Sequence, residues 1–121
     1  MIFGIGTDII ELERVENALL KEHFKKRVFS KREQDYCEGR KSQRIASYAA
    51  RFAAKEAIGK ALKCGISGGD LTELEILNEE SGAPKAVLCG KWLELLPKDA
   101  TVHITLSHSK KYATAECIIE G

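Results

Sequence analysis

What this 121-residue chain lacks excludes several classes of protein. It has no apolar run long enough to cross a bilayer, and its start, Met1-Ile-Phe-Gly, lacks the basic flank and cleavage pattern of a secretory leader. Its four cysteines form no C-x-x-C pair, which argues against a structural zinc site and a disulfide framework. We therefore expect a cytoplasmic protein with reduced, buried thiols.

The sequence also lacks a strong charge of either sign, because its net charge is +1 at pH 7. That balance argues against a general nucleic-acid coat. The charge is uneven, however: between Arg14 and Arg32 seven basic residues stand against two acidic ones, a local excess of +5. With 44% hydrophobic residues the chain can bury a core, but it is too short for two ordinary domains, so we expect one domain over residues 1–121.

The strongest helix signal is the alanine-rich stretch Ser47–Lys63, and the sequence predicts a long helix over about residues 42–64. Phe52, Glu56 and Lys60 follow one another at a spacing of four residues and therefore share one face of this helix. The carboxylate and the ammonium either belong to a polar site or form an ordinary exposed ion pair. The helix alone leaves both interpretations open.

Alternation of apolar and polar residues, and turn residues between the alternating segments, predict strands and short helices around the long helix. The capping box Ser30-Lys-Arg-Glu33 indicates where one of these helices begins. The expected strands are residues 1–10, 71–77, 85–89, 102–107 and 112–119, the last four as two hairpins, and the expected helical segments are 11–20, 31–38 and 92–96.

Three polar features each allow two interpretations. Asp8, at the end of a glycine-containing strand, either caps the next helix or is a ligand. The basic segment Lys21–Lys26, with Phe24 among its lysines, is either a solvated surface with a core aromatic or a docking surface for an acidic helical protein. The tip Ser107-His-Ser-Lys-Lys111 is either a polar turn or an anion site, since its side chains can all donate to phosphate oxygens.

Asp8 and Glu56 offer two carboxylates from different elements, and Lys60 follows Glu56 by one helical turn. Magnesium is bound by one or two carboxylates and completes its octahedron with water and substrate phosphate. With an anion site at the second hairpin tip, these residues are the parts of a magnesium-assisted phosphate site.

Two segments resemble the paired signature of the 4′-phosphopantetheinyl transferases: Ile5-Gly-Thr-Asp8 and Arg51-Phe-Ala-Ala-Lys-Glu-Ala-Ile-Gly-Lys60. The short length, the helix that carries Arg14 and the Ser107-His-Ser-Lys110 tip are similar to the bacterial holo-acyl-carrier-protein synthase type. The resemblance covers nearly the whole chain. It implies an α+β fold, with a small antiparallel sheet packed on one long central helix, and a homotrimer with sites between subunits.

The resemblance also implies an activity, which is transfer of phosphopantetheine from coenzyme A to a serine of an apo acyl carrier protein, with release of adenosine 3′,5′-bisphosphate. It implies that Asp8 and Glu56 bind Mg²⁺, that Glu56 is the candidate general base, and that Lys60 offsets charge on the phosphoryl oxygens. The implied coenzyme A ligands are Arg51, Lys60, His108 and Ser109. The implied carrier-protein contacts are Arg14, Lys21, Phe24, Lys25 and Arg27.

Ile10 stands where larger two-domain relatives carry a second acid, so we expect water rather than a third protein ligand at the metal. Two other functions match part of the pattern: a magnesium-dependent hydrolase of nucleotide pyrophosphates, and a noncatalytic module that binds coenzyme A or a carrier protein. The basic segment argues against the hydrolase. The presence of Asp8, Glu56 and Lys60 argues against the module, which has little need of a metal-polarised phosphate.

Overall fold

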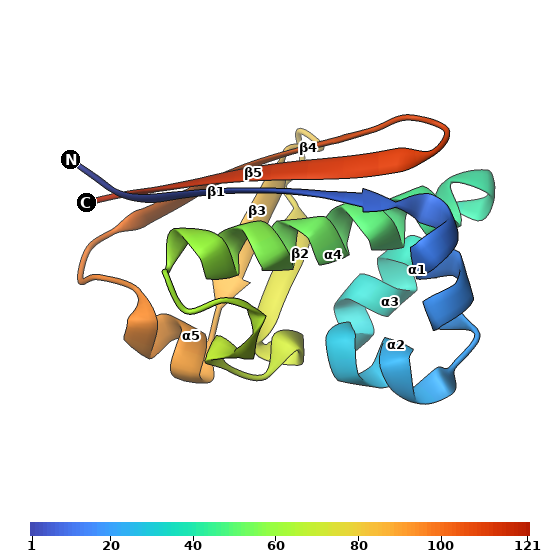
Figure 1. Cartoon of the computed structure of the whole chain (residues 1–121), viewed down its shortest axis with the longest axis horizontal. Coiled ribbons are helices and arrows are strands. Elements are labelled where there is room, and N and C mark those ends of the chain that lie inside the picture. The colour runs from blue at the N-terminus through green and yellow to red at the C-terminus, as the bar shows by residue number, and fades with distance from the viewer.

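The computed structural model describes residues 1–121 and has an α+β fold around one long helix, which confirms the expected fold class. Strands β1, β5 and β4 form an antiparallel sheet in that order, and β2 and β3 form a separate hairpin. The sheet runs along one side of α4, with α1–α3 packed at one end of this helix and α5 near the other (Figure 1). The elements are β1 (Ile2–Glu11), α1 (Leu12–Leu19), α2 (Glu22–Val28), α3 (Lys31–Glu38), α4 (Arg44–Ala61), β2 (Leu74–Asn78), β3 (Pro84–Leu88), α5 (Gly90–Leu95), β4 (Thr101–His108) and β5 (Tyr112–Glu120).

The core is built on α4, whose small apolar residues are buried between the sheet and the β2–β3 hairpin. Alanine is a strong helix former, and its short side chain lets neighbouring elements pack close to the helix backbone. The inward-facing residues predicted for β5 are confirmed as buried, and Trp92 of α5 is fully buried against the same core. No helix here combines the length and apolar character that spanning a membrane requires. Buried members of this core are Ala53, Ala57, Ile58, Ala61, Leu74, Ile76, Trp92, Ala115, Cys117 and Ile119.

Two glycines allow β1 to lie directly on α4. A Cβ atom added at Gly6 would stand 2.0 Å from the carbonyl oxygen of Ala57, and one added at Gly4 would stand 2.0 Å from that of Ala61. Side chains alternate along a strand, so Asp8 points to the same side of β1 as Gly4 and Gly6. The close backbone approach expected from the sequence is confirmed, and it carries Asp8 to α4.

Several local expectations were wrong. Of the two interpretations left open for Asp8, the helix cap is wrong, because β1 extends to Glu11 and Glu11 is the residue that precedes α1. The expected strand over 71–77 begins only at Leu74, because the Asp70 carboxylate accepts a hydrogen bond from the Thr72 amide and initiates a short 3₁₀ turn. Helix α4 is also shorter than expected, since residues 41–43 form a separate 3₁₀ turn and the α-helix ends at Ala61.

Two further differences concern the basic segment and the thiols. Residues 22–28 form helix α2, for which no helix was predicted. Of the cysteines only Cys37 and Cys117 are buried, whereas Cys64 is half-buried and Cys89 is exposed. The capping box at Ser30 and Glu33 is confirmed, and α3 spans the predicted residues.

Candidate active site

Asp8 of β1 and Glu56 and Lys60 of α4 line the same surface cavity, which has a volume of about 320 Å³. The alternation of β1 and the helical spacing of α4 turn these side chains toward one another once the two elements are in contact. Aliphatic and aromatic side chains form the other wall, and Arg14 of α1 contributes a second cation. The lining residues are Asp8, Ile9, Ile10, Arg14, Val15, Ala18, Phe24, Phe52, Glu56 and Lys60.

Lys60 connects α4 to β1. Its ammonium donates a hydrogen bond to the carbonyl oxygen of Thr7 at 2.8 Å and lies 3.4 Å from Oδ1 of Asp8. The ordinary Glu56–Lys60 ion pair considered from the sequence is not formed, because the lysine reaches the strand instead. Half of the Lys60 side chain remains exposed, so its ammonium is accessible from the cavity.

The carboxyl group of Glu56 is in a setting that disfavours its charge. Partial burial and then the nearby charge of Asp8 raise the pKa of Glu56, and Lys60 and Arg14 oppose that shift. A divalent cation relieves repulsion of this kind between two carboxylates. The two carboxylates of the cavity are the kind of oxygen donor that Mg²⁺ accepts from proteins, with water and phosphate as its other ligands.

Arg51 does not line this cavity, because its side chain leaves α4 about 140° around the helix from that of Glu56. It is only 4% exposed. Its guanidinium donates to the Ser47 carbonyl and hydroxyl oxygens and to Asn78 Oδ1, and the Tyr36 ring lies 4.3 Å from its central carbon. The buried Nε of Arg51 has no hydrogen-bond partner.

A second cavity, of about 430 Å³, opens beside Arg51. Arg32, Arg51 and Lys85 line it and no acid does. Arg32 is paired with Glu75 at 2.6 Å, so Arg51 and Lys85 are the cations whose charge favours an anionic group. Apart from Arg51, sequence reasoning found none of these residues, because they come from α3, α4, β2 and β3 and no spacing in the sequence links them. The lining residues are Arg32, Tyr36, Arg51, Ile76, Leu77, Asn78 and Lys85.

His108 and Ser109 lie at the tip of the β4–β5 hairpin, at the end of the sheet beside α1 (Figure 1). The Ser109 hydroxyl accepts hydrogen bonds from the amides of Lys111 at 3.3 Å and Tyr112 at 3.2 Å, so it shapes the turn. Neither His108 nor Ser109 lines the Asp8 cavity or the Arg51 cavity. A single chain therefore does not bring all the predicted coenzyme A ligands together.

The predicted partner-binding residues have different surroundings. Phe24 packs on Phe52 with ring centroids 6.0 Å apart and also lines the Asp8 cavity, so it is both a packing residue and a site residue. Lys25 is not a free cation, because its ammonium lies 3.6 Å from Glu38 and its side chain is only 19% exposed. Arg14, Lys21 and Arg27 are exposed, and together they are called the basic surface here. Of these, Arg14 lines the Asp8 cavity, whereas Arg27 borders a different cavity beside Asp70 and Leu71.

Glu38 links α3 to α4 through hydrogen bonds that the sequence did not indicate. Its carboxylate accepts hydrogen bonds from Arg44 Nε at 2.7 Å and from the Tyr48 hydroxyl at 2.6 Å. These two hydrogen bonds lower the pKa of Glu38 to about 2. The carboxylate therefore stays charged at neutral pH and neutralises part of the basic charge of Lys25 and Arg44.

Comparison with known proteins identifies one family for this chain. Residues 4–117 match the 4′-phosphopantetheinyl transferase superfamily. A holo-[acyl-carrier-protein] synthase of Fusobacterium nucleatum is 44% identical over 122 residues, which is 98% of this chain and 99% of the relative.

Solved structures give the same result. The crystal structure of a Bacillus anthracis holo-(acyl-carrier-protein) synthase in complex with CoA (3′,5′-ADP) aligns with a TM-score of 0.84 and 36% identity, over 100% of this chain and 98% of that one. A holo-[acyl-carrier-protein] synthase from Neisseria meningitidis aligns with a TM-score of 0.88 and 28% identity over the whole of both chains. The chain belongs to the 4′-phosphopantetheinyl transferase superfamily.

Proposed function

We propose that this chain, acting as one domain over residues 1–121, transfers 4′-phosphopantetheine from coenzyme A to a serine of an apo acyl carrier protein and releases adenosine 3′,5′-bisphosphate. The observation that carries the proposal is the cavity that joins Asp8, Glu56 and Lys60 to Phe24 and to Arg14 of the basic surface. Full-length similarity to holo-[acyl-carrier-protein] synthases supports the choice of substrates.

In the proposed reaction the serine oxygen forms a bond to the phosphorus that carries pantetheine, and the bond from this phosphorus to the bridging pyrophosphate oxygen breaks. Glu56 accepts the serine proton, directly or through water. Lys60, held by the Thr7 carbonyl, offsets negative charge on the phosphoryl oxygens. Asp8 and Glu56 would hold Mg²⁺, which would supply Lewis-acid stabilisation of negative charge at the phosphates.

For coenzyme A we propose contacts from Arg51, Lys60, His108 and Ser109. The buried Nε of Arg51 has no hydrogen-bond partner, so its N–H donor is left for an anionic group. Because the hairpin tip lies apart from both cavities within one chain, the contacts of His108 and Ser109 are proposed to come from a neighbouring subunit.

A homotrimer with sites between subunits is the proposed assembly. α4 covers one face of the β1–β5–β4 sheet, and the opposite face exposes Ile5, Ile9 and Ile118, at 69%, 63% and 43% respectively. Ile5 and Ile118 are paired across β1 and β5, so their side chains are neighbours on that face. A group of exposed apolar side chains is typical of an interface. A cavity on this face is lined by Ile5 and Ile118, by the polar residues Thr7 and Glu116, and by Lys60 of the active site.

Replacing Ile5 by lysine tests this assembly. Ile5 is mostly exposed in one chain, so the variant should fold, whereas a charge on the buried face of an oligomer is costly. We expect a monomer by size-exclusion chromatography with light scattering, and at least a tenfold lower transfer rate. Leu93→Lys is the matched control, since Leu93 is 57% exposed on α5 and should leave both measurements unchanged. A fully active monomer of Ile5→Lys would contradict the shared-site assembly.

Intact-protein mass spectrometry of an apo acyl carrier protein tests the reaction itself. The carrier is incubated with this protein, coenzyme A and Mg²⁺, with and without a chelator. We expect a mass gain of one phosphopantetheinyl group that the chelator prevents. No gain with a folded protein and several carriers would overturn the transferase proposal, and a gain that persists in excess chelator would overturn the metal assignment.

A further inference from the structure

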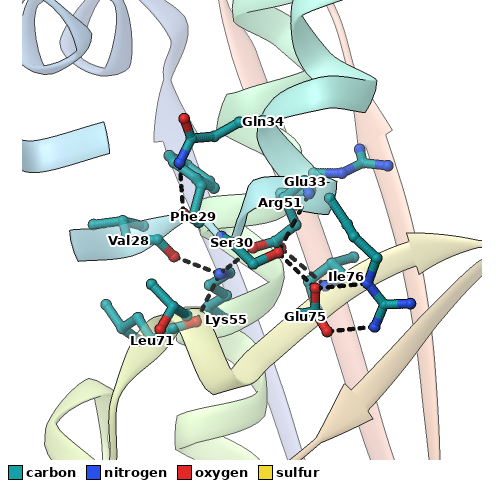
Figure 2. Close-up of polar contacts among 12 residues, drawn as sticks. Val28, Phe29, Ser30, Glu33, Gln34, Arg51, Lys55, Leu71, Glu75 and Ile76 are labelled. Carbon is teal, nitrogen blue, oxygen red and sulfur yellow. Dashed lines mark hydrogen bonds and ion pairs between the residues drawn. The ribbon is translucent and has the colours of Figure 1, made fainter. Parts of the chain in front are cut away.

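Lys55 precedes Glu56 in α4 but points in a different direction, into the interior. Its side chain is completely buried, and its ammonium donates to Glu33 Oε1 at 2.7 Å, to the Leu71 carbonyl oxygen at 2.8 Å and to the Val28 carbonyl oxygen. An ammonium group has three donor hydrogens, so all three are used. Figure 2 shows the Lys55 nitrogen among these acceptors.

Its partner Glu33 is equally buried and fully bonded. Besides Lys55, the carboxylate accepts hydrogen bonds from the amides of Ser30 and Ile76, each at 2.9 Å (Figure 2). Burial lowers the pKa of Lys55, and the charge of Glu33 opposes that shift. Well-packed apolar residues often replace such pairs without loss of stability, so stability alone is a weak explanation for this one.

The acceptors around Lys55 belong to three segments, of which α2 contributes a residue to the Asp8 cavity. Val28 is the last residue of α2, Glu33 lies in the first turn of α3, and Leu71 opens the 3₁₀ turn before β2. α2 is only seven residues long, and its first residues have no side-chain cap. The hydrogen bond from Lys55 to the Val28 carbonyl therefore connects the end of α2, a short helix without a side-chain cap, to α4, which carries Glu56 and Lys60.

The position of α2 matters because this helix carries one residue of the cavity wall and part of the proposed carrier-binding surface. Phe24, in the middle of α2, forms part of the cavity wall with Asp8 and Glu56. Arg27, the residue before Val28, is exposed on the basic surface. A shift of the α2 end by one ångström would move the basic surface relative to the reacting groups, and transfer reactions are sensitive to misplacement on that scale.

We propose that Lys55 is a positioning residue for the carrier protein: through its bonds to Val28 and Glu33 it sets the place of α2, and hence of the carrier-binding surface, relative to Glu56 and Lys60. This inference rests on the proposed transferase function. Lys55 touches no reacting atom; its effect on the reaction passes through α2.

The test removes both charges together, because Lys55→Met alone would leave the Glu33 carboxylate buried without its cation. The double variant Lys55→Met/Glu33→Gln keeps the side-chain lengths and makes the pair neutral. Lys31→Met is the matched control, since it removes an exposed ion pair with Asp35 on the same α3 helix. If the first double variant does not fold, Lys55→Gln/Glu33→Gln, which retains amide hydrogen bonding, is measured in the same way.

Three readouts separate positioning from general destabilisation. We expect the Kd for apo carrier protein, titrated without coenzyme A, to rise at least tenfold, while the Kd for coenzyme A stays within twofold. Amide hydrogen exchange should accelerate over residues 22–28 and remain slow over 44–61. Lys31→Met should change none of these values.

A folded double variant with a carrier Kd within twofold of the parent would overturn the inference, whether or not exchange over 22–28 changes. So would equal losses of carrier and coenzyme A binding, because these indicate general damage to the fold. Failure of the proposed function is a separate result: a parent protein that transfers nothing in the mass-spectrometric assay. The titration and exchange measurements do not depend on transfer, so they still test Lys55 in that case.

Discussion

Glu56→Gln should lower the transfer rate constant by about 10³-fold or more while leaving the affinity for the carrier protein within twofold. The substitution removes a proposed metal ligand and the proposed proton acceptor, but it keeps the size of the side chain. Carrier binding should persist because Arg14, Lys21 and Arg27 supply the basic surface, and removal of a negative charge does not weaken attraction for an acidic partner.

Single-turnover transfer and carrier titration measure these two quantities. Glu94→Gln on α5 is the control, since Glu94 is exposed and lies outside the Asp8 cavity. Added Mg²⁺ should fail to restore the Glu56 variant at concentrations that saturate the parent. Normal turnover in the variant would remove Glu56 from the mechanism and leave Asp8, Lys60 and Arg14 as the remaining charged groups of the cavity.

Gly6→Ala should unfold part of the structure or separate β1 from α4, at a cost of about 3 kcal/mol or more. The added Cβ would stand 2.0 Å from the Ala57 carbonyl oxygen and 2.9 Å from its carbon, and backbone atoms cannot move aside as a flexible side chain can. We expect a melting temperature roughly 10 °C lower and loss of transfer even in the folded fraction, because Asp8 would move away from Lys60.

Thermal unfolding followed by circular dichroism measures the change, and Gly39→Ala is the control. A Cβ at Gly39 would make only ordinary contacts, at 3.5 and 3.6 Å, and the φ of Gly39 is −79°, so the control should stay within about 0.5 kcal/mol of the parent. A Gly6 variant with parental stability would show that β1 can withdraw from α4 without cost.

The main elements of the fold were predictable because the chain carries clear local periodicity. Alternation in β4 and β5 and the alanine-rich stretch of α4 specify their own conformation and buried faces, and Ser30 with Glu33 specifies the start of α3. The element boundaries were less predictable, since the ends at Leu74 and Ala61 depend on local turn and cap bonds such as that between Asp70 and Thr72.

By itself the sequence determined which side chains share a face: Asp8 with the two glycines of β1, and Phe52, Glu56 and Lys60 along α4. These relations follow from the fixed repeat of a strand and a helix, so they needed no knowledge of the fold. The family signature rests on the same residues, and the comparisons confirm the family.

Only the tertiary structure decided which of these faces meet. Lys60 bonds to Thr7 and lies beside Asp8 instead of Glu56 because β1 packs on α4 at the glycines. Arg51 enters a cavity with residues of three other elements, and Lys55 joins α2, α3 and the turn at Leu71. Contacts between residues distant in the chain depend on how complete elements pack together, and no local repeat in the sequence encodes that packing.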